Sequence, residues 1–465
     1  MVVALFLLGA NLKRNSNEGL GLRNWPEITS RFRCGADFSR PHKLYLTTGM
    51  SGRQAEPLSA SMGKTRSVYF PNLNGLRFIA ALVVMIHHTE QGKLSLGLPS
   101  VFLTSPFIGV IGKLGVVLFF VLSGFLITYL LLEEESQTGI SVRHFYVRRI
   151  LRIWPLYYLI ILLALFVLPY VSFFTFPGYG IDVVHENLWF KTVLYVTLFA
   201  NLILPTVGLV PYASQTWSVG TEEQFYLLWP LLTKYVRNKV RLMLSVIALY
   251  LAARVLLSPR IVVIGTGPWQ SWLTGFLGAF NIDCMAIGGL AAVILHKRHK
   301  PLAWMLNLPV FYVTLTVAVI LIAGGVTFHP LHYEFYAVLF ALLILNFAAN
   351  DRIGWSLEFE PFHYLGKISY GLYMFHPIAI SVALRLLSRL GWTHDIAIYP
   401  ACTLATIGLA AVSYRFFESP FLRMKDRFAE VVSGESARSA VVVVASRPPV
   451  LPDEPVESPE TIPRQ

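Results

Sequence analysis

Long apolar runs recur along this chain of 465 residues, and they restrict its possible folds more than any other feature. Runs of about 18 to 25 apolar residues match the length that an α-helix needs to cross the hydrocarbon core of a bilayer. Hydrophobic residues make up 55% of the chain and charged residues only 14%, and a soluble domain would not bury so much apolar surface. The sequence therefore predicts an all-α fold, a polytopic helical bundle with the lipid bilayer around it.

We divide the apolar sequence into eleven candidate membrane-spanning segments. Most of them have the length of one crossing and are separated by polar or basic connections. They cover residues 73–93, 108–132, 150–170, 188–206, 222–237, 240–257, 273–295, 306–325, 331–349, 365–388 and 395–417.

Basic residues gather in five clusters between these segments, and such clusters mark the cytoplasmic side of a membrane protein. All five share one side only if 188–206 and 222–237 together make one net crossing. We therefore predict about ten transmembrane helices, both termini in the cytoplasm, and one interfacial or re-entrant piece within 171–237. The clusters are Lys64/Arg66, Arg143/Arg148/Arg149/Arg152, Lys234/Arg237/Lys239/Arg241, His296/Lys297/Arg298/Lys300 and Arg423/Lys425/Arg427.

The two ends of the chain differ in composition from the apolar middle. Residues 1–66 are mixed in character and form a poor signal peptide, so we predict an N-terminal extension outside the fold, with Met62 as a natural start. Residues 67–425 form the membrane domain. Residues 426–465 are rich in Pro, Glu, Ser and Val and are predicted to be a disordered C-terminal tail.

The distribution of charge argues against a nucleic-acid partner, and the spacing of the cysteines argues against a metal site and a disulfide framework. The formal charge is +12, but the basic residues lie in short clusters between apolar runs rather than on one basic face, so no nucleic-acid partner is predicted. The three cysteines lie far apart with no paired Cys or His spacing, so neither a metal site nor a disulfide framework is indicated.

The first predicted span, LNGLRFIAALVVMIHHTEQ, carries Arg77 near its start and His87 and His88 near its end. A charge in hydrocarbon costs at least a few kcal/mol, so such residues usually face the bundle interior and serve a function. Arg77 and His88 are eleven residues apart, about three helical turns or about 16 Å, so they share one helix face while His87 points elsewhere. Alternatively, Arg77 reaches the cytoplasmic surface and both histidines lie at the outer interface.

Ser123 and Gly124 interrupt the second span, and small residues in membrane helices usually permit close packing. A nucleophilic serine is the weaker interpretation, because no G-x-S-x-G motif is present. Arg148, Arg149 and Arg152 follow at the cytoplasmic edge of the next helix. Topology alone explains them, but coenzyme A would also need such a cluster, since arginine binds phosphate through paired hydrogen bonds.

Glu222 and Glu223 begin an aromatic-rich apolar run after a threonine that could cap a helix. The helix dipole favours carboxylates there, but two acids beside a membrane cavity could also support a histidine. Asp283 lies inside another span, where an ionised carboxylate must be paired or neutralised. His376 precedes a proline late in the chain, either at a stabilised kink or in a second polar wall of the same cavity.

Taken together, these stretches resemble the acyltransferase-3 family of membrane O-acyltransferases, which modify envelope carbohydrates and some antibiotics. The resemblance runs from about residue 68 to about residue 425. It rests on motifs that occur in the family's order: LNGLRFIAALVVMIHH, FFVLSGFLI, RRILRIWPLY, WSVGTEEQFYLLWP, IDCMAIGGLAA and SYGLYMFHP.

The resemblance implies roles for individual residues. His88 is expected to act as general base or acyl carrier, with Arg77 on the donor or the oxyanion and Glu222 or Glu223 in support. Three arginines would bind the donor, and five residues would line the acceptor site. The donor-binding set is Arg148, Arg149 and Arg152, and the substrate-binding set is Trp217, Ser218, Asp283, Tyr370 and His376. The family often has an arginine two residues before the aspartate, where this chain has Asn281, so an Arg–Asp pair is missing.

The function predicted from the sequence is transfer of an acyl group, acetyl above all, from acyl-CoA to a hydroxyl of an envelope carbohydrate or glycolipid. The chain is expected in the plasma (inner) membrane and needs no metal. One alternative is acylation of a secondary metabolite such as a macrolide. A proton-coupled secondary transporter is the other, because carriers also place Arg, His and Asp within the membrane, although this sequence has no self-similar halves.

Overall fold

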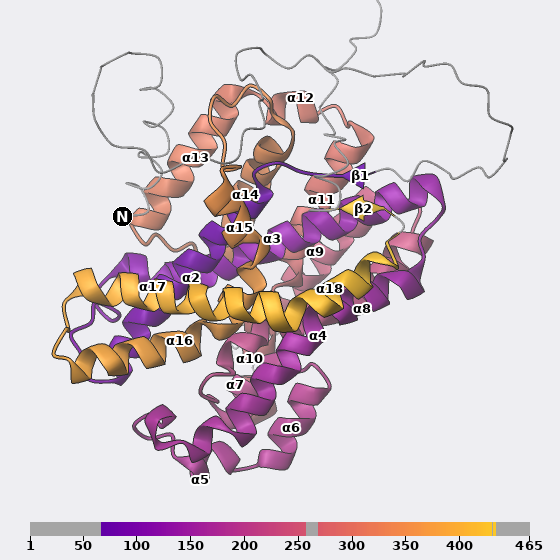
Figure 1. The fold of residues 1–465 in the computed structure, drawn as a ribbon. Coiled ribbons are helices and arrows are strands. Elements are labelled where there is room, and N and C mark those ends of the chain that lie inside the picture. The colour runs from indigo at the N-terminus through magenta and orange to yellow at the C-terminus, as the bar shows by residue number, and fades with distance from the viewer. Residues whose placement is uncertain (1–66, 257–267, 430, 434–465) are drawn as a thin grey trace, which may run out of the picture. The chain divides into compact units, whose positions relative to one another are not determined.

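The computed structural model describes residues 67–256, 268–429 and 431–433. In this part of the chain the fold is helical apart from two short strands, β1 (Ser67–Val68) and β2 (Val432–Ser433), which pair in parallel (Figure 1). The predicted all-α fold is confirmed. The predicted N-terminal extension lies outside the described residues.

The first half of the described chain contains five helices of 18 to 32 residues and a group of short ones. They are α2 (Leu73–Ser95), α3 (Pro106–Gln137), α4 (Val142–Phe166), η1 (Leu168–Tyr170), η2 (Ser172–Phe174), α5 (Ile181–His185), α6 (Leu188–Val196), η3 (Ala200–Leu202), α7 (Ile203–Val207), η4 (Ser214–Thr216), α8 (Trp217–Tyr235) and α9 (Lys239–Leu256).

The second half ends in a long helix that continues through one turn of π-helix, shown in yellow in Figure 1. Its elements are α10 (Pro268–Phe280), α11 (Ile282–Lys297), α12 (Leu302–Met305), α13 (Leu308–Ala323), α14 (His332–Ala349), α15 (Glu360–Lys367), α16 (Ser369–Arg389), α17 (Asp395–Ser413), η5 (Tyr414–Glu418) and α18 (Ser419–Asp426).

Six helical stretches of the described chain are long and apolar enough to cross a membrane. A further apolar helix, Leu308–Ala323, is shorter. The predicted count of about ten crossings therefore stays a prediction. The six stretches are Pro106–Gln137, Val142–Tyr170, Leu273–Lys297, His332–Ala349, Ser369–Arg389 and Asp395–Asp426.

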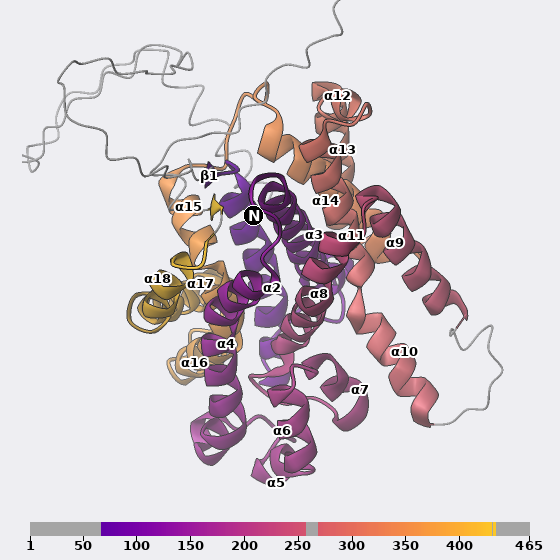
Figure 2. The same ribbon diagram turned by 90° about the vertical axis from the view of Figure 1, so that its right-hand side faces the viewer.

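The region predicted to contain an irregular piece consists of short helices. Residues 188–206 form α6, η3 and most of α7, and each of these is too short to cross a bilayer alone. By contrast, α8 is one continuous helix of 19 residues. Helices α5, α6 and α7 gather at the same end of the bundle in both views (Figures 1 and 2).

Helix α3 lies in the centre of the bundle and packs against α2 and α11. Small residues permit the close crossing with α11: a Cβ atom on Gly124 would lie 1.9 Å from the carbonyl oxygen of Met285, and one on Gly288 would lie 2.1 Å from that of Val121. The prediction that Gly124 serves close helix packing is confirmed.

Three of the predicted cytoplasmic clusters meet at one end of α3. Arg148 forms an ion pair with Glu134, Lys239 with Glu135 at 2.8 Å, and His296 with Glu133 at 3.2 Å. The structure thus brings basic clusters from three connections to the same end of the bundle, as the predicted topology requires.

The two ends of the described chain also lie together, because Ser67 pairs with Val432 and Val68 with Ser433. Both ends are therefore on one side of the bundle, which fits an even number of crossings. Strand β2 lies past residue 426, the predicted start of the C-terminal tail, and residues 434–465 lie outside the described chain, so the tail stays a prediction.

Candidate active site

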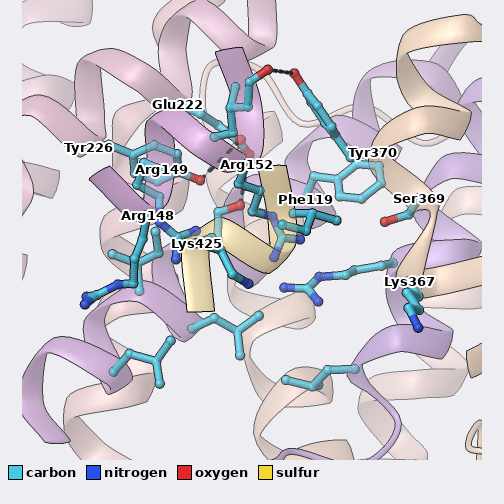
Figure 3. Close-up of a pocket in the computed structure, with 18 of the residues that line it drawn as sticks. Phe119, Arg148, Arg149, Arg152, Glu222, Tyr226, Lys367, Ser369, Tyr370 and Lys425 are labelled. Atoms are coloured by element: carbon cyan, nitrogen blue, oxygen red, sulfur yellow. Dashed lines mark hydrogen bonds between the residues drawn. The ribbon is translucent and has the colours of Figure 1, made fainter. Parts of the chain in front are cut away.

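A cavity of about 360 Å³ opens among α2, α3, α4, α8, α16 and the final helix. Six basic and four acidic side chains line it, together with tyrosines and apolar residues. In Figure 3 Arg148, Arg149, Arg152 and Lys425 lie on one side, with Lys367, Ser369 and Tyr370 on the other. The charged lining residues are Arg77, Arg148, Arg149, Arg152, Lys367, Lys425, Glu134, Glu222, Glu418 and Asp426.

The three arginines at the start of α4 all face this cavity, but their surroundings differ. Arg148 is held by its ion pair with Glu134 and by donating to the carbonyl of Phe428 at 2.9 Å. The guanidinium of Arg149 lies over the rings of Phe145 and Tyr226, at 5.6 and 5.8 Å from their centroids. Arg152 makes no hydrogen bond or ion pair with the described chain, so its donors are available to a ligand.

Three further cations join the arginines in the same cavity. Arg77 reaches it from α2 and donates to Asn74 Oδ1 at 3.2 Å. Lys367, from the end of α15, and Lys425, from α18, were not singled out as site residues in the sequence. Lys425 belongs to the last basic cluster, which the sequence analysis used only to set topology. The sequence therefore marked Lys425 as part of a basic cluster, but the place of that cluster in the chain did not indicate that it shares a cavity with the arginines of α4.

Glu222 is also part of the cavity wall, and it is held from two sides. Its carboxylate accepts hydrogen bonds from Ser123 Oγ at 2.9 Å and from the hydroxyl of Tyr226 at 3.2 Å. Glu223 does not line the cavity and accepts from the indole N–H of Trp154 at 2.9 Å. In the described chain neither glutamate is hydrogen-bonded to His88.

The interpretation of these glutamates as first-turn residues behind a threonine cap is wrong. Helix α8 begins at Trp217, a full turn earlier, so Glu222 and Glu223 lie in its second turn. The threonine in question, Thr221, is within the helix and donates back to the carbonyl of Trp217 at 3.4 Å. Hydrogen bonds from Ser123 of α3, Trp154 of α4 and Tyr226 of α8 itself, and not the helix dipole, therefore hold the two carboxylates.

The cavity extends deep into the bundle. It is lined by α3 from Glu134 to Val116, which is about 27 Å of helix at 1.5 Å per residue. One turn beyond Val116, a Cβ atom on Gly112 would lie 2.4 Å from the ring of His87. This contact sets the register between α2 and α3, and it places the His87–His88 pair just past the inner end of the cavity.

His88 does not line the cavity with Arg77, although both residues belong to α2. Its ring packs against that of His376 from α16, with the two centroids 4.7 Å apart. The sequence assigned both histidines to the site, and the structure brings them into direct contact. Within the described residues, no group of three or more His, Cys, Asp or Glu side chains could hold a metal ion.

Tyr373 lies between the cavity and the histidines. It lines the cavity, and its ring centroid is 5.7 Å from that of His376. Its hydroxyl group is 2.7 Å from Ser218 Oγ and donates to the carbonyl of Gln215 at 2.9 Å. Ser218 is thereby placed at the inner end of the cavity.

Two other residues predicted to bind the acceptor have distinct positions. Tyr370 lines the cavity and donates to the carbonyl of Ile153 at 2.9 Å, which ties α16 to α4 (Figure 3). Trp217 lies outside the cavity, where its ring packs against Phe120 with centroids 6.0 Å apart and the Lys113 ammonium is 5.7 Å from its centroid.

Asp283 lies in a second polar cluster, away from the cavity lining. It is fully buried at the start of α11, immediately after the break at Asn281, and its neighbours include Glu334 and Arg254. Arg254 of α9 forms an ion pair with Glu334 of α14. Arg254 is thus paired with Glu334, and neither carboxylate oxygen of Asp283 has a hydrogen-bond partner in the described chain.

Comparison with known proteins agrees with this arrangement. The model of the acyltransferase domain family matches residues 70–415. The peptidoglycan O-acetyltransferase OatA of Listeria monocytogenes is 28% identical over 375 residues, covering 76% of this chain and 56% of the relative. The O-acetyltransferase OatA of Staphylococcus aureus is 25% identical over 417 residues, covering 82% of this chain and 62% of the relative.

A third relative, the putative peptidoglycan O-acetyltransferase YrhL of Bacillus subtilis, is 28% identical over 382 residues, covering 76% of this chain and 55% of the relative. The chain thus spans between 55% and 62% of the length of these relatives. No solved structure matches it. Because the family model covers most of the described bundle, with five of the six basic residues of the cavity and both contacting histidines, the chain belongs to the acyltransferase-3 family of acyltransferase domains.

Proposed function

We propose that this chain is a membrane O-acyltransferase that transfers an acetyl group from acetyl-CoA to a hydroxyl of cell-wall carbohydrate. The observation that carries the proposal is the deep cationic cavity that ends beside the contact between His88 and His376. The names of the relatives point to peptidoglycan as the class of acceptor.

The donor would bind in the cavity. Coenzyme A carries several phosphate groups, and the six basic side chains exceed the four acidic ones. Arg148 is already paired with Glu134, whereas Arg152 has its donors free. Arginine binds phosphate through two parallel hydrogen bonds, so Arg152 and Arg77 are suited to grip the phosphates while the thioester arm extends inward.

His88 would serve as the general base. Its Nε2 takes the proton of the acceptor hydroxyl as the hydroxyl oxygen attacks the thioester carbon, and the carbon–sulfur bond then breaks. The coenzyme A thiolate leaves and receives that proton, so the balance is one ester and one free thiol. A histidine is suited to both proton transfers because it changes charge near neutral pH.

The two substrates would approach from opposite faces of the membrane. We place the chain in the plasma membrane with the end that carries the basic clusters in the cytoplasm, because basic connections stay inside. Acetyl-CoA then enters from the cytoplasm, and the carbohydrate reaches His88 from the outer half of the bundle. Tyr373, which lines the cavity and lies beside His376, would then stand where the two substrates meet.

The test is acceptor-dependent release of free coenzyme A from acetyl-CoA, in membranes that hold equal amounts of each variant, with muropeptides as acceptor. His88→Ala should lower turnover by at least about 10²-fold, the usual contribution of a general base. His87→Ala is the matched control and should stay close to wild type, because His87 Nδ1 donates to the carbonyl of Ile108 and lies outside the proposed chemistry.

Near-normal turnover in the His88→Ala variant would remove this mechanism. Transport of an unmodified solute by wild-type membranes, without release of coenzyme A, would establish the carrier instead. Turnover with a macrolide acceptor but not with muropeptides would show that the acceptor is a secondary metabolite and not cell-wall carbohydrate.

A further inference from the structure

The contact between His88 and His376 joins two helices that are far apart in the sequence, α2 and α16. The two rings are 4.7 Å apart between centroids and are tilted by 52°. His376 is completely buried. His376 Nδ1 is 2.6 Å from the carbonyl oxygen of Tyr373, which Pro377 leaves without its helical N–H donor, so this nitrogen stabilises the helix at the proline. That role leaves the other nitrogen, Nε2, without an explanation.

The hydrogen bonds of the two rings determine which nitrogen carries the proton. His88 Nδ1 lies 2.9 Å from the carbonyl oxygen of Val84, and His376 Nδ1 lies 2.6 Å from that of Tyr373. A carbonyl oxygen only accepts, so Nδ1 is the donor in both rings. In a neutral imidazole the other nitrogen, Nε2, then holds a free lone pair.

Neither Nε2 atom is used by the fold. His376 Nε2 is buried and has no hydrogen-bond partner, and His88 Nε2 makes no hydrogen bond within the described chain. Leaving a buried acceptor unpaired costs about 1 to 3 kcal/mol. Two histidines with free, unprotonated Nε2 atoms therefore touch each other directly beyond the inner end of the cavity.

We infer that His376 is a positioning residue for the reaction, whose Nε2 accepts a hydrogen bond from His88 once His88 has taken up the acceptor proton. The inference rests on the proposed acyl transfer. In the step, the acceptor O–H bond breaks, its proton bonds to His88 Nε2, and the resulting imidazolium donates that N–H to His376 Nε2. When the thiolate leaves, the proton passes to sulfur and both rings return to their starting tautomers.

A hydrogen bond from His88 to His376 would stabilise the positive charge that forms on His88 when it takes up the acceptor proton. A protonated imidazole in surroundings of low dielectric is costly unless a partner accepts its hydrogen bond. Glu222 and Glu223 accept hydrogen bonds from Ser123, Tyr226 and Trp154, and neither carboxylate is hydrogen-bonded to His88 in the described chain. The hydrogen bond between the two Nε2 atoms would form only in the reacting complex, because catalytic hydrogen bonds are often long or poorly aligned until the substrate binds.

The experiment compares two conservative variants of His376. His376→Asn keeps a donor for the carbonyl of Tyr373 but removes the acceptor at the Nε2 position, and His376→Gln places an amide oxygen near that position. We expect kcat to fall at least about 10²-fold in His376→Asn and to recover to within about 10-fold of wild type in His376→Gln. The KM for acetyl-CoA should stay within about twofold in both, because donor binding occurs in the cavity.

His87→Asn is the matched control, since it keeps the donor to Ile108 and also loses its Nε2, and it should turn over like wild type. Equal accumulation and equal stabilisation by coenzyme A in a thermal-unfolding assay show that each variant is folded and binds the donor.

A double-mutant cycle completes the test. If the two histidines act as a unit, His88→Ala combined with His376→Asn should be no slower than His88→Ala alone. The inference is overturned if the two losses multiply, if His376→Asn turns over normally, or if Asn and Gln behave alike. Absence of acceptor-dependent release in the wild type would instead overturn the proposed function itself.

Discussion

Arg152 and Arg143 lie on the same helix but have different surroundings. Arg152 faces the cavity and has no ion-pair or hydrogen-bond partner in the described chain, whereas Arg143 is exposed in the first turn of α4 and lies outside the cavity lining. Both belong to the basic cluster that the sequence analysis used for topology. The family resemblance already assigned Arg152, and not Arg143, to the donor site, and the structure adds that only Arg152 of the two lines the cavity.

We therefore predict that Arg152→Lys raises the KM for acetyl-CoA by about tenfold, because lysine keeps the charge but loses the planar fork that matches a phosphate. Arg143→Lys should leave KM unchanged and is the matched control. The measurement is initial rate against acetyl-CoA concentration in membranes. A similar KM for both variants would exclude Arg152 from the donor site.

Other site residues show how far single positions can be interpreted from the sequence. Arg77 and His88 were expected from their places in an apolar span, where a charge is costly, and Arg149 from the basic cluster at the start of α4. Arg77 and Arg149 line the cavity, whereas His88 does not. Lys367, Tyr226 and Glu418 also line the cavity but were not named. Lys367 and Glu418 are the last residues of α15 and η5, and Tyr226 lies within the aromatic-rich run of α8, so the sequence around each of them does not indicate a shared cavity.

At the scale of elements, the crossing of α3 with α11 determines how tightly the bundle closes. Gly124 on α3 meets the backbone of Met285, and no side chain fits between them. Gly109 lies on the same helix, but a Cβ atom there would meet nothing within 4 Å. The same substitution at these two sites should therefore have opposite effects.

Gly124→Ala should destabilise the protein by about 1 to 3 kcal/mol, because the added methyl group forces the two backbones apart. Gly109→Ala should stabilise it slightly, by up to about 1 kcal/mol, because alanine favours the helix. Thermal unfolding in detergent provides the comparison. A Gly124→Ala protein that unfolds no earlier than wild type would show that this crossing is looser than described.

The observed helix boundaries differ from those expected from hydrophobicity in two segments, 188–206 and the start of α8. Hydrophobicity over 188–206 suggested a span, yet the chain breaks into short helices there, with Leu198 at a φ of 64°. The residues of α8 before Glu222 are less apolar, and the predicted segment began too late. In both cases a run of apolar residues predicts that the segment lies in lipid or in the protein interior. It does not predict where the helix begins or breaks.

For the whole molecule, the main expectation is orientation. The contacts of Arg148, Lys239 and His296 with three consecutive glutamates of α3 bring their clusters to one end of the bundle. Reporter fusions near residues 239 and 298 should therefore both lie in the cytoplasm, and a fusion near residue 100, in the connection between α2 and α3, should lie outside. Opposite locations for the first two fusions would contradict the arrangement of the bundle.

The sequence by itself determined the class of fold, the positions of most helices and the family. These properties depend on local signals: the length of apolar runs, which a bilayer of fixed thickness imposes, and short motifs that keep their order along the chain. Such signals do not require knowledge of which helices are neighbours.

Only the tertiary structure decided which polar residues act together. It placed Arg77 in the cavity, brought His88 to His376, moved Asp283 into a cluster with Glu334, and tied Glu222 to Ser123. The physical reason is that packing between helices distant in sequence sets these contacts. In a membrane, nearly every helix is apolar enough to pack against several others, so the partner is selected by small residues such as Gly124 and by buried polar pairs.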